Sequence, residues 1–138
     1  MRDYIRRLEN ARNLYDSLLS SKIFEFSELT PSMLPIAAGV YVIWLKDTEE
    51  ALYVGRTVNL RRRLYQGHLM GNRATARIKK YLIDDVNYPD IKDYPEAKEF
   101  IKARCNFQFI LEEDSNGRGH IEGLLGYLSD ARYIENEH

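Results

Sequence analysis

The sequence has few of the residues from which disulfide bonds and structural zinc sites are built. Cys105 is the single cysteine, which excludes an intramolecular disulfide and any zinc site built from several cysteines. No apolar run approaches the ~20 residues that a membrane helix needs, and the charged N-terminus lacks the apolar core of a signal peptide. A cytoplasmic protein without membrane segments is therefore expected. Its 138 residues suffice for one globular domain with a hydrophobic core.

Charge is nearly balanced over the whole chain but is unevenly distributed along it. The formal net charge is −1, which alone says nothing about nucleic acid. Residues 51–83, however, contain eight Lys or Arg and no Asp or Glu, whereas residues 84–138 contain thirteen acidic and six basic residues. Because the local field governs phosphate binding, a neutral protein of this kind can present a strongly positive face.

The N-terminal part of the chain predicts a helix followed by a connector. Residues 2–20 carry one apolar stripe at helical spacing, which predicts a helix that packs across the domain as an added layer. A dimerisation helix is the alternative interpretation. Residues 22–38 contain two prolines, each of which disfavours helix at the preceding residue, so this stretch is expected to be a connector. We therefore divide the chain into a helix and connector over residues 1–30, packed on the core, and a main part over residues 31–138.

The main part of the chain predicts three strands and four helices. Two apolar runs at residues 39–45 and 51–55 flank a polar stretch and predict a β-hairpin, and residues 106–111 predict a third strand. The first predicted helix is capped by Thr57 or Asn59, carries three arginines and is interrupted by Gly67 and Gly71. The second covers residues 73–86 and is capped by Asn72, and the third covers residues 94–104 and is capped by Asp93. The fourth covers residues 119–130 and follows a turn at residues 115–117.

Four polar residues are predicted to form a site that cuts a phosphodiester bond. This reaction needs a base for water, positive charge for the transition state and stabilisation of the leaving oxygen, commonly by a divalent metal. Tyr41 and Tyr53 are expected to face the same side of the hairpin, within a few ångströms, because neighbouring strands lie ~4.8 Å apart. Arg63 on the next helix could bind the phosphate. Glu122, beside the apolar stripe of the last helix, could reach a groove and hold Mg²⁺, for which one carboxylate can suffice.

These residues resemble the GIY-YIG nuclease superfamily in their order and spacing. The resemblance covers roughly residues 38–130, and it is carried by Gly39-Val40-Tyr41, by Tyr53-Val54-Gly55 twelve residues later, by Asn59-Leu60 with Arg63, and by Glu122 on the final helix.

The resemblance implies a fold, a reaction and a role for each site residue. The implied fold is α/β (α+β), a small three-stranded antiparallel sheet flanked by helices, to which the N-terminal helix is added. The implied reaction is hydrolysis of DNA with one Mg²⁺ or Mn²⁺ ion, leaving 5′-phosphate and 3′-hydroxyl ends. Tyr53, or in some interpretations Tyr41, would activate the water, Arg63 would steady the phosphate and Glu122 would hold the ion.

The chain departs from the pattern of the superfamily in two places. Many members carry a Pro and then an Asn about a dozen residues after the metal glutamate, and residues 129–134 contain neither. Many members also have His or Tyr four residues after the arginine, where this chain has Gly67 followed by His68. A glycine can distort the end of a helix, so His68 is kept as a candidate site residue.

Two functions other than the endonuclease stay open at this point. One is a nucleic-acid-binding module that keeps the GIY-YIG fold with weak or no catalysis, and the other is a purely structural interaction domain. A homodimer or a partner protein at the N-terminal helix is also possible. For the DNA-binding functions, the predicted backbone contacts are the basic and amide side chains of Arg56, Asn59, Arg61, Arg62, Arg73, Arg77 and Lys80.

Overall fold

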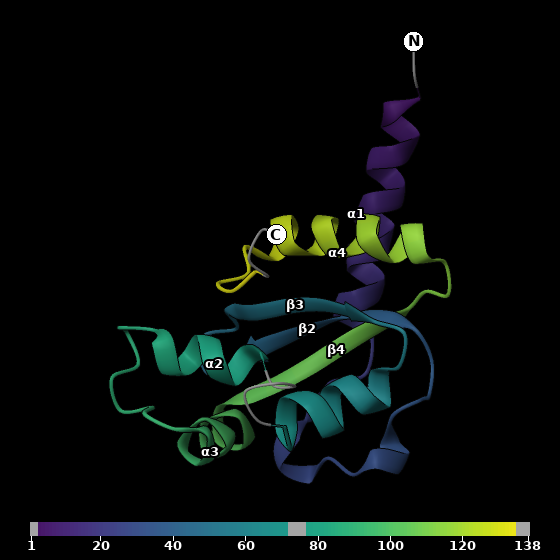
Figure 1. Cartoon of the computed structure of the whole chain (residues 1–138). Coiled ribbons are helices and arrows are strands. Elements are labelled where there is room, and N and C mark those ends of the chain that lie inside the picture. Colours follow the sequence, from purple (N-terminus) through teal and green to yellow (C-terminus); the bar gives the residue numbers. More distant parts are fainter. Residues whose placement is uncertain (1–2, 72–76, 135–138) are drawn as a thin grey trace.

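A four-stranded antiparallel sheet lies between two layers of helices in the computed structural model, which describes residues 3–71 and 77–134 (Figure 1). The strand order is β1-β4-β2-β3, so β3 is an edge strand. Helices α1 and α4 cover one face, and α2, α3 and η3 cover the other (Figure 1). The fold is therefore of the predicted class. The elements are α1 (Tyr4–Ser20), β1 (Phe24–Glu25), η1 (Phe26–Glu28), η2 (Pro31–Met33), β2 (Gly39–Leu45), β3 (Ala51–Thr57), η3 (Arg62–Leu69), α2 (Arg77–Asp84), α3 (Tyr94–Arg104), β4 (Cys105–Leu111) and α4 (Ser115–Ser129).

The predicted hairpin is confirmed as β2 and β3. Leu45 donates its backbone N–H to the carbonyl of Glu50 at 2.8 Å and closes the polar loop between the strands. Strand β3 continues to Thr57, two residues beyond its predicted end, because Gly39 pairs with Thr57 at the far end of the ladder. Pairing on the other side of β2 with β4 makes β2 a central strand, which accounts for its continuous apolar sequence.

The prediction of three strands is wrong by one, because the connector contributes β1. Phe24 lies opposite Phe107 of β4, and the two rings stack with their centroids 5.3 Å apart. A two-residue strand is too short to produce an alternating pattern, so the sequence did not reveal it. The N-terminal segment is thus part of the sheet as well as a helix that packs on it.

Two helix predictions agree closely with the structure. Helix α1 begins at Tyr4, two residues later than predicted, and the side chain of Asp3 accepts a hydrogen bond from the N–H of Arg6. Helix α3 has the predicted bounds, and Asp93 caps it by accepting a hydrogen bond from the N–H of Glu96 at 2.9 Å. Within residues 3–71 and 77–134, no helix is both long and apolar enough to cross a membrane.

Two other helix predictions need correction. The turn predicted at residues 115–117 is the first turn of α4, because Asp114 accepts a hydrogen bond from the N–H of Gly117 at 2.7 Å and starts the helix there. Helix α2 ends at Asp84, two residues before its predicted end. The predicted cap of that helix, Asn72, lies outside the described residues, as does Arg73.

Two buried clusters fill the space between the sheet and the helices. Successive residues of a strand face opposite sides, so Tyr41 and Ile43 join the larger cluster under α2 and α3, while Val40 and Val42 join the smaller one under α1 and α4. Cys105 is buried in the larger cluster, and burial raises the pKa of its thiol to about 12. The prediction of a buried thiol rather than a nucleophile at this position is confirmed.

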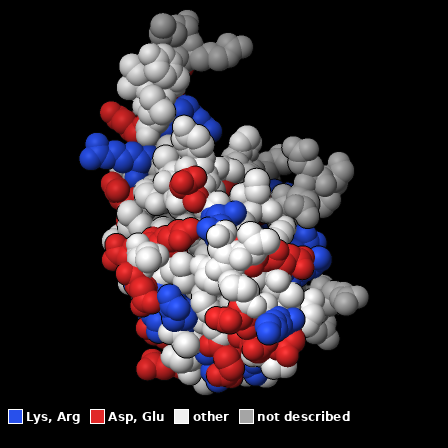
Figure 2. Space-filling view, turned by 90° about the vertical axis from the view of Figure 1, so that its left-hand side faces the viewer, with Lys and Arg blue, Asp and Glu red and all other residues white. Residues whose placement is uncertain are grey.

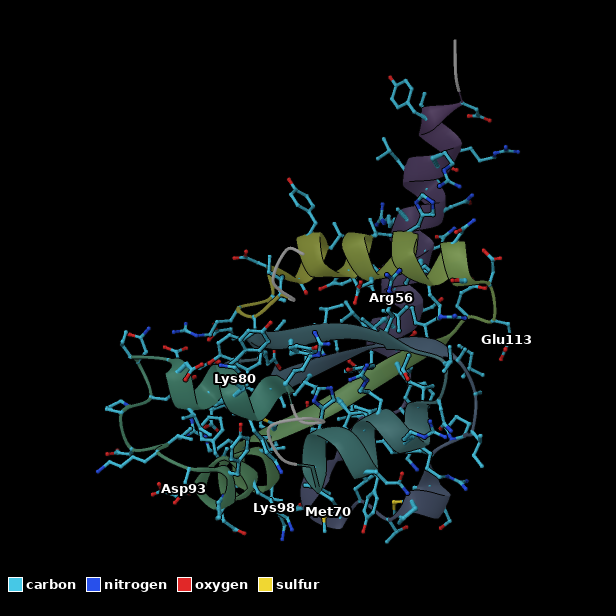
Figure 3. All side chains as sticks on the ribbon, in the orientation of Figure 1. Arg56, Met70, Lys80, Asp93, Lys98 and Glu113 are labelled. Carbon is cyan, nitrogen blue, oxygen red and sulfur yellow. The ribbon has the colours of Figure 1, made fainter. Side chains whose placement is uncertain are left out.

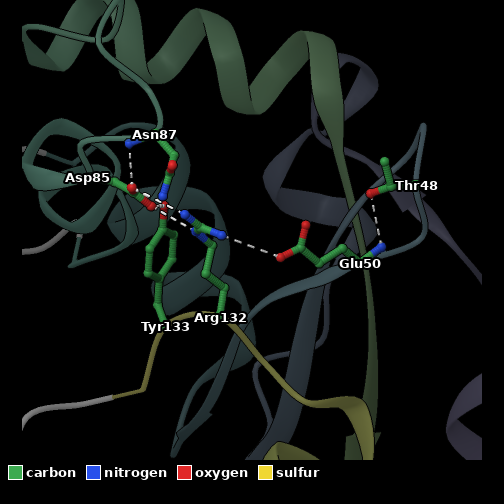
Figure 4. A network of polar contacts seen from close by, with 6 residues as sticks. All are labelled: Thr48, Glu50, Asp85, Asn87, Arg132 and Tyr133. Atoms are coloured by element: carbon green, nitrogen blue, oxygen red, sulfur yellow. Dashed lines mark hydrogen bonds and ion pairs between the residues drawn. The ribbon is translucent and has the colours of Figure 1, made fainter.

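The chain after α4 returns to the edge strand and is held there by a C-terminal clasp, which consists of Asp85, Arg132 and Tyr133 (Figure 4). The backbone N–H of Tyr133 donates to the carbonyl of Leu52 at 2.7 Å. Arg132 donates two hydrogen bonds to the Asp85 carboxylate, at 2.7 and 3.2 Å, and the Tyr133 hydroxyl donates a third at 2.7 Å. These bonds, the one from Arg132 first, hold the pKa of Asp85 below its usual 3.8.

The Asp85→Asn substitution is expected to lower the free energy of unfolding at pH 7 by about 1.5–3 kcal/mol, because it removes hydrogen bonds to a charged group. The folded-state pKa lies below the unfolded one, so this stability is present above pH ~4 and is lost as the pH falls toward the folded-state pKa. Urea unfolding at pH 7 and near pH ~3 measures the difference, which should shrink at the lower pH. Asp84→Asn is the control, because its ion pair with Lys80 is exposed; equal losses in the two variants would contradict the prediction.

Candidate active site

Tyr41 and Tyr53 lie on the same face of the hairpin, as the strand alternation predicted. Tyr41 pairs with Gly55 across the ladder and Tyr53 pairs with Ile43, so the two tyrosines are diagonal neighbours. Their rings stack with centroids 6.1 Å apart at an interplanar angle of 26°. Each residue is only 1% exposed, so the rings form part of the core as well as of the candidate site.

Gly55 leaves the space that the two tyrosine rings occupy. A Cβ at this position would overlap the Tyr41 hydroxyl and would lie 2.9 Å from Cε1 of Tyr53. Both contacts are closer than a real side chain tolerates, and both neighbours are buried and cannot move aside freely. The glycine of the Tyr53-Val54-Gly55 triplet is therefore required by packing against the candidate site.

The Gly55→Ala substitution is expected to lower the free energy of unfolding by about 1–3 kcal/mol, because it overpacks a dense cluster. The substitution should also lower activity, because it displaces the Tyr41 hydroxyl. Urea unfolding measures the loss of stability. Gly126→Ala on α4 is the matched control, since a Cβ there meets nothing within 4 Å. A Gly55→Ala protein as stable as the wild type would contradict the packing argument.

His68 lies in the same pocket of rings. Its Nε2 is 2.5 Å from the Tyr41 hydroxyl, and its ring centroid is 5.4 Å from that of Tyr41 and 5.1 Å from that of Tyr53, edge-on to both. Within the described part of the chain, the buried Nδ1 of His68 has no hydrogen-bond partner. The contact with Tyr41 is therefore the hydrogen bond that fixes the imidazole.

His68 is neutral at physiological pH. Its pKa falls from 6.5 to about 3, first because burial disfavours the charged ring and then because Arg63, Lys79 and Arg77 contribute positive charge nearby. In the tautomer protonated on Nδ1, the Tyr41 hydroxyl donates to Nε2. A pKa this low makes His68 a group that orients Tyr41 rather than a base that stores a proton.

Helix η3, which carries His68 to the tyrosines, is wound as a π-helix. The N–H of Met70 bonds to the carbonyl of Tyr65, five residues earlier, at 2.9 Å. Gly67 was predicted to interrupt this helix, and that prediction is wrong, since the helix continues to Leu69. Burial of Leu69 and its neighbours offsets the cost of about 1 kcal/mol that glycine imposes on a helix. π-turns of this kind are frequent at functional sites.

Both ends of η3 are held by side chains. At the start, Asn59 accepts a hydrogen bond from the N–H of Arg62 at 3.1 Å, which confirms Asn59 as a cap. At the other end, the buried ammonium of Lys79 donates to the carbonyls of Leu69 at 2.6 Å and Gly71 at 2.7 Å. Burial lowers the pKa of Lys79 to about 8. In the sequence Lys79 is one basic residue among the eight of residues 51–83, and no pattern distinguishes it from the others.

Arg63 lies beside a surface pocket of about 380 Å³ at the end of β3 and the start of η3. Its guanidinium is half-buried and close enough to His68 to lower the pKa of the imidazole. The positive wall and the helix start suit a phosphate-sized anion. The pocket is lined by Thr57, Val58, Asn59, Arg62, Arg63, Gln66 and Gly67.

The other predicted DNA contacts differ in their surroundings. Arg61 donates its Nε–H to the carbonyl of Leu34 at 2.9 Å and so helps to hold the connector. Lys80 belongs to the stretch of residues 51–83 that contains no Asp or Glu, but it pairs with Asp84 at 2.9 Å, one helical turn later. Arg77 is exposed. On the face seen in Figure 2, acidic and basic side chains are interspersed, so this face is not the strongly positive one that the charge distribution allowed.

Glu122 approaches β3 from the opposite side of the sheet. Arg56 alternates with Gly55 and therefore points away from the tyrosine rings, toward α4 (Figure 3). Its Nε lies 3.6 Å from Oε1 of Glu122. The structure thus places the predicted residues in two groups, Tyr41 and Tyr53 with His68 and Arg63 on one face, and Arg56 with Glu122 on the other. A site that uses both groups has to lie at the C-terminal end of the β3 edge, because Arg132 and Tyr133 pair with the start of that strand.

The donor set at Glu122 fits a divalent ion that keeps most of its waters. Among the described residues, no three His, Cys, Asp or Glu side chains come together to form a metal site, so a zinc-like cage is not built there. Mg²⁺ needs only one or two carboxylates when water and phosphate complete its shell. Glu122 is the only acidic residue of α4, its side chain is 27% exposed, and a cationic guanidinium already lies against its carboxylate.

Comparison with known families identifies the domain to which the hairpin and η3 belong. Residues 37–106, slightly more than half of the chain, match the model of the GIY-YIG catalytic domain. The matched segment contains Tyr41, Tyr53, Arg63 and His68, whereas Glu122 follows it. Neither the curated proteins nor the solved structures yielded a significant match.

Proposed function

Because this chain belongs to the GIY-YIG catalytic domain family, we propose that it is a divalent-metal-dependent endonuclease that hydrolyses DNA phosphodiester bonds. The observation that supports this proposal most directly is the contact of Tyr41, Tyr53 and His68 beside Arg63, at an edge strand whose other face meets Glu122. Water activation, phosphate binding and metal binding each have a residue at that edge.

In the proposed mechanism Tyr53 takes the proton from the attacking water. A phenol has an ordinary pKa of ~10, which nearby positive charge lowers and burial raises. The Tyr41 hydroxyl, 2.5 Å from His68 Nε2, is already engaged with the imidazole. We therefore assign Tyr41 to orienting and polarising the site, and we assign Tyr53 as the general base because it matches the tyrosine to which the family resemblance gives that role.

Arg63 binds the scissile phosphate in the pocket at the start of η3 and neutralises charge that develops in the transition state. Glu122 would hold one Mg²⁺ or Mn²⁺ ion, which when bound would supply Lewis-acid stabilisation of the phosphate and the leaving oxygen. The DNA backbone on either side is contacted by the remaining cationic and amide groups, Arg56, Asn59, Arg61, Arg62, Arg73, Arg77 and Lys80.

Nicking of supercoiled and of branched DNA tests the function. The wild-type chain is expected to produce nicks in the presence of Mg²⁺ or Mn²⁺, and none with excess chelator. The products should carry 5′-phosphate and 3′-hydroxyl ends, so a DNA ligase should reseal them without further treatment. Cleavage that continues undiminished with chelator would contradict a metal-dependent reaction.

A nucleic-acid-binding module with weak or no catalysis is the second candidate. Two observations favour it: both tyrosines are only 1% exposed, and Arg56 lies on the carboxylate that would hold the ion. This candidate predicts DNA binding that weakens steeply with salt and no nicks with either metal. The nicking assay therefore separates the two functions.

The exposed apolar side of α1 bears on the quaternary structure. Beyond the body of the domain (Figure 1), Tyr4 is 55% exposed, Ile5 60% and Leu8 62%. A homodimer or a partner protein at this helix stays a prediction, as does the cytoplasmic location. Sedimentation of the whole chain, compared with Leu8→Glu, measures self-association at this surface.

A further inference from the structure

The guanidinium of Arg56 lies on α4 between Gly119 and Glu122, which are three residues apart and share one side of the helix. Its Nε is 3.6 Å from the Glu122 carboxylate. A Cβ built on Gly119 would lie 2.5 Å from Nη1 of Arg56. The glycine thus leaves the space in which the guanidinium rests, and the glutamate supplies the negative charge beside it.

We propose that Arg56 is a displaceable counter-ion of Glu122, which a divalent ion must replace and which is thereby released to bind the DNA backbone. This inference rests on the proposed function of Glu122 as the metal ligand. It adds a role that neither residue has alone, because it makes metal binding and DNA binding depend on the same side chain.

The ion pair is weak enough to be displaced. The side chain of Arg56 is 51% exposed and that of Glu122 is 27% exposed, and such surface pairs change an equilibrium by a factor of about five or less. A divalent ion at the carboxylate carries twice the charge of a guanidinium, so it competes well for Glu122. It also repels the nearby Arg56.

The released guanidinium has an obvious new partner. Arg56 is the second-to-last residue of edge strand β3, and Thr57 beside it lines the pocket that is also lined by Arg63. A phosphate at this edge can accept hydrogen bonds from a guanidinium that no longer faces a carboxylate. Metal should therefore tighten DNA binding, and DNA should tighten metal binding by the same factor.

Four variants test the inference through Mn²⁺ binding measured without DNA and without turnover. Mn²⁺ broadens nearby amide NMR signals, and a titration of the α4 amides yields a dissociation constant. Arg56→Gln and Gly119→Ala are each expected to bind Mn²⁺ about 2–5-fold more tightly than the wild type, because the competing charge is removed or moved aside. Gly123→Ala is the matched control, since a Cβ there meets nothing within 4 Å, and it should bind as the wild type does. Glu122→Gln should lose the site.

DNA binding measured in Ca²⁺ distinguishes Arg56→Gln from Gly119→Ala, the two variants that are expected to bind Mn²⁺ more tightly. Arg56→Gln is expected to bind DNA several-fold more weakly, because it lacks a phosphate contact, whereas Gly119→Ala keeps the arginine and should bind at least as well as the wild type. If Glu122→Gln binds Mn²⁺ like the wild type, the proposed metal site itself is wrong. If the site depends on Glu122 but neither Arg56→Gln nor Gly119→Ala binds Mn²⁺ more tightly, only the counter-ion role is overturned.

Discussion

Replacing Glu122 with glutamine is expected to remove metal-dependent DNA cleavage, lowering kcat by about 10³-fold or more. Glutamine keeps the size of the side chain but removes the charge that would hold the ion. The fold should be retained, because the ion pair with Arg56 is partly exposed and such pairs contribute about 1 kcal/mol or less. Single-turnover nicking at increasing Mg²⁺ and Mn²⁺ measures the effect, together with urea unfolding of the same protein.

Glu113→Gln is the matched control for this prediction. Glu113 is exposed and lies just before α4, away from Arg56 (Figure 3), so its replacement removes one negative charge without touching the site. We expect this variant to cleave like the wild type. Cleavage that persists at the wild-type rate in Glu122→Gln would remove Glu122 from the metal role.

Replacing Tyr53 with phenylalanine is expected to lower kcat by about 10²–10⁴-fold, the usual contribution of a general base. Tyr41→Phe should lower kcat less and affect stability more. It leaves Nε2 of the fully buried His68 without its hydrogen-bond partner, which costs about 1–3 kcal/mol. The two phenylalanine variants thus separate the residue that takes the proton from the residue that orients the site.

Single-turnover cleavage and urea unfolding, measured on both variants at a temperature where each is fully folded, give the comparison. Tyr127→Phe on α4 is the control, since this tyrosine is 85% exposed and should change neither quantity. If Tyr41→Phe lost more activity than Tyr53→Phe at equal folding, the assignment of the base would be reversed. Equal small losses in both would contradict a tyrosine base of either kind.

Local patterns in the sequence predicted the elements that carry the site. The hairpin followed from two runs of β-branched and aromatic residues around a polar loop. Helix α3 followed from Asp93, whose carboxylate accepts a hydrogen bond from the N–H of Glu96, and from Pro95, which suits the first turn of a helix. These predictions needed only neighbours in the chain, and they are confirmed.

The predictions that failed depended on contacts between distant residues. Strand β1 exists because Phe24 stacks on Phe107, more than eighty residues away. Helix η3 continues through Gly67 because its buried side packs on the core. In each case tertiary packing outweighed a local preference of about 1 kcal/mol or less per residue.

The sequence alone was enough to predict the family, the position of Tyr41 and Tyr53 on the same face of a hairpin, and the order in which the site residues occur. Only the tertiary structure decided how those residues are grouped. The alternation of β3 directs Tyr53 and Gly55 to one side and Arg56 to the other, and α4 packs on that second side. Glu122 therefore contacts the edge strand at Arg56. This contact could not be read from local patterns, because the position of α4 on the sheet is set by the burial of its apolar side against residues far away in the chain.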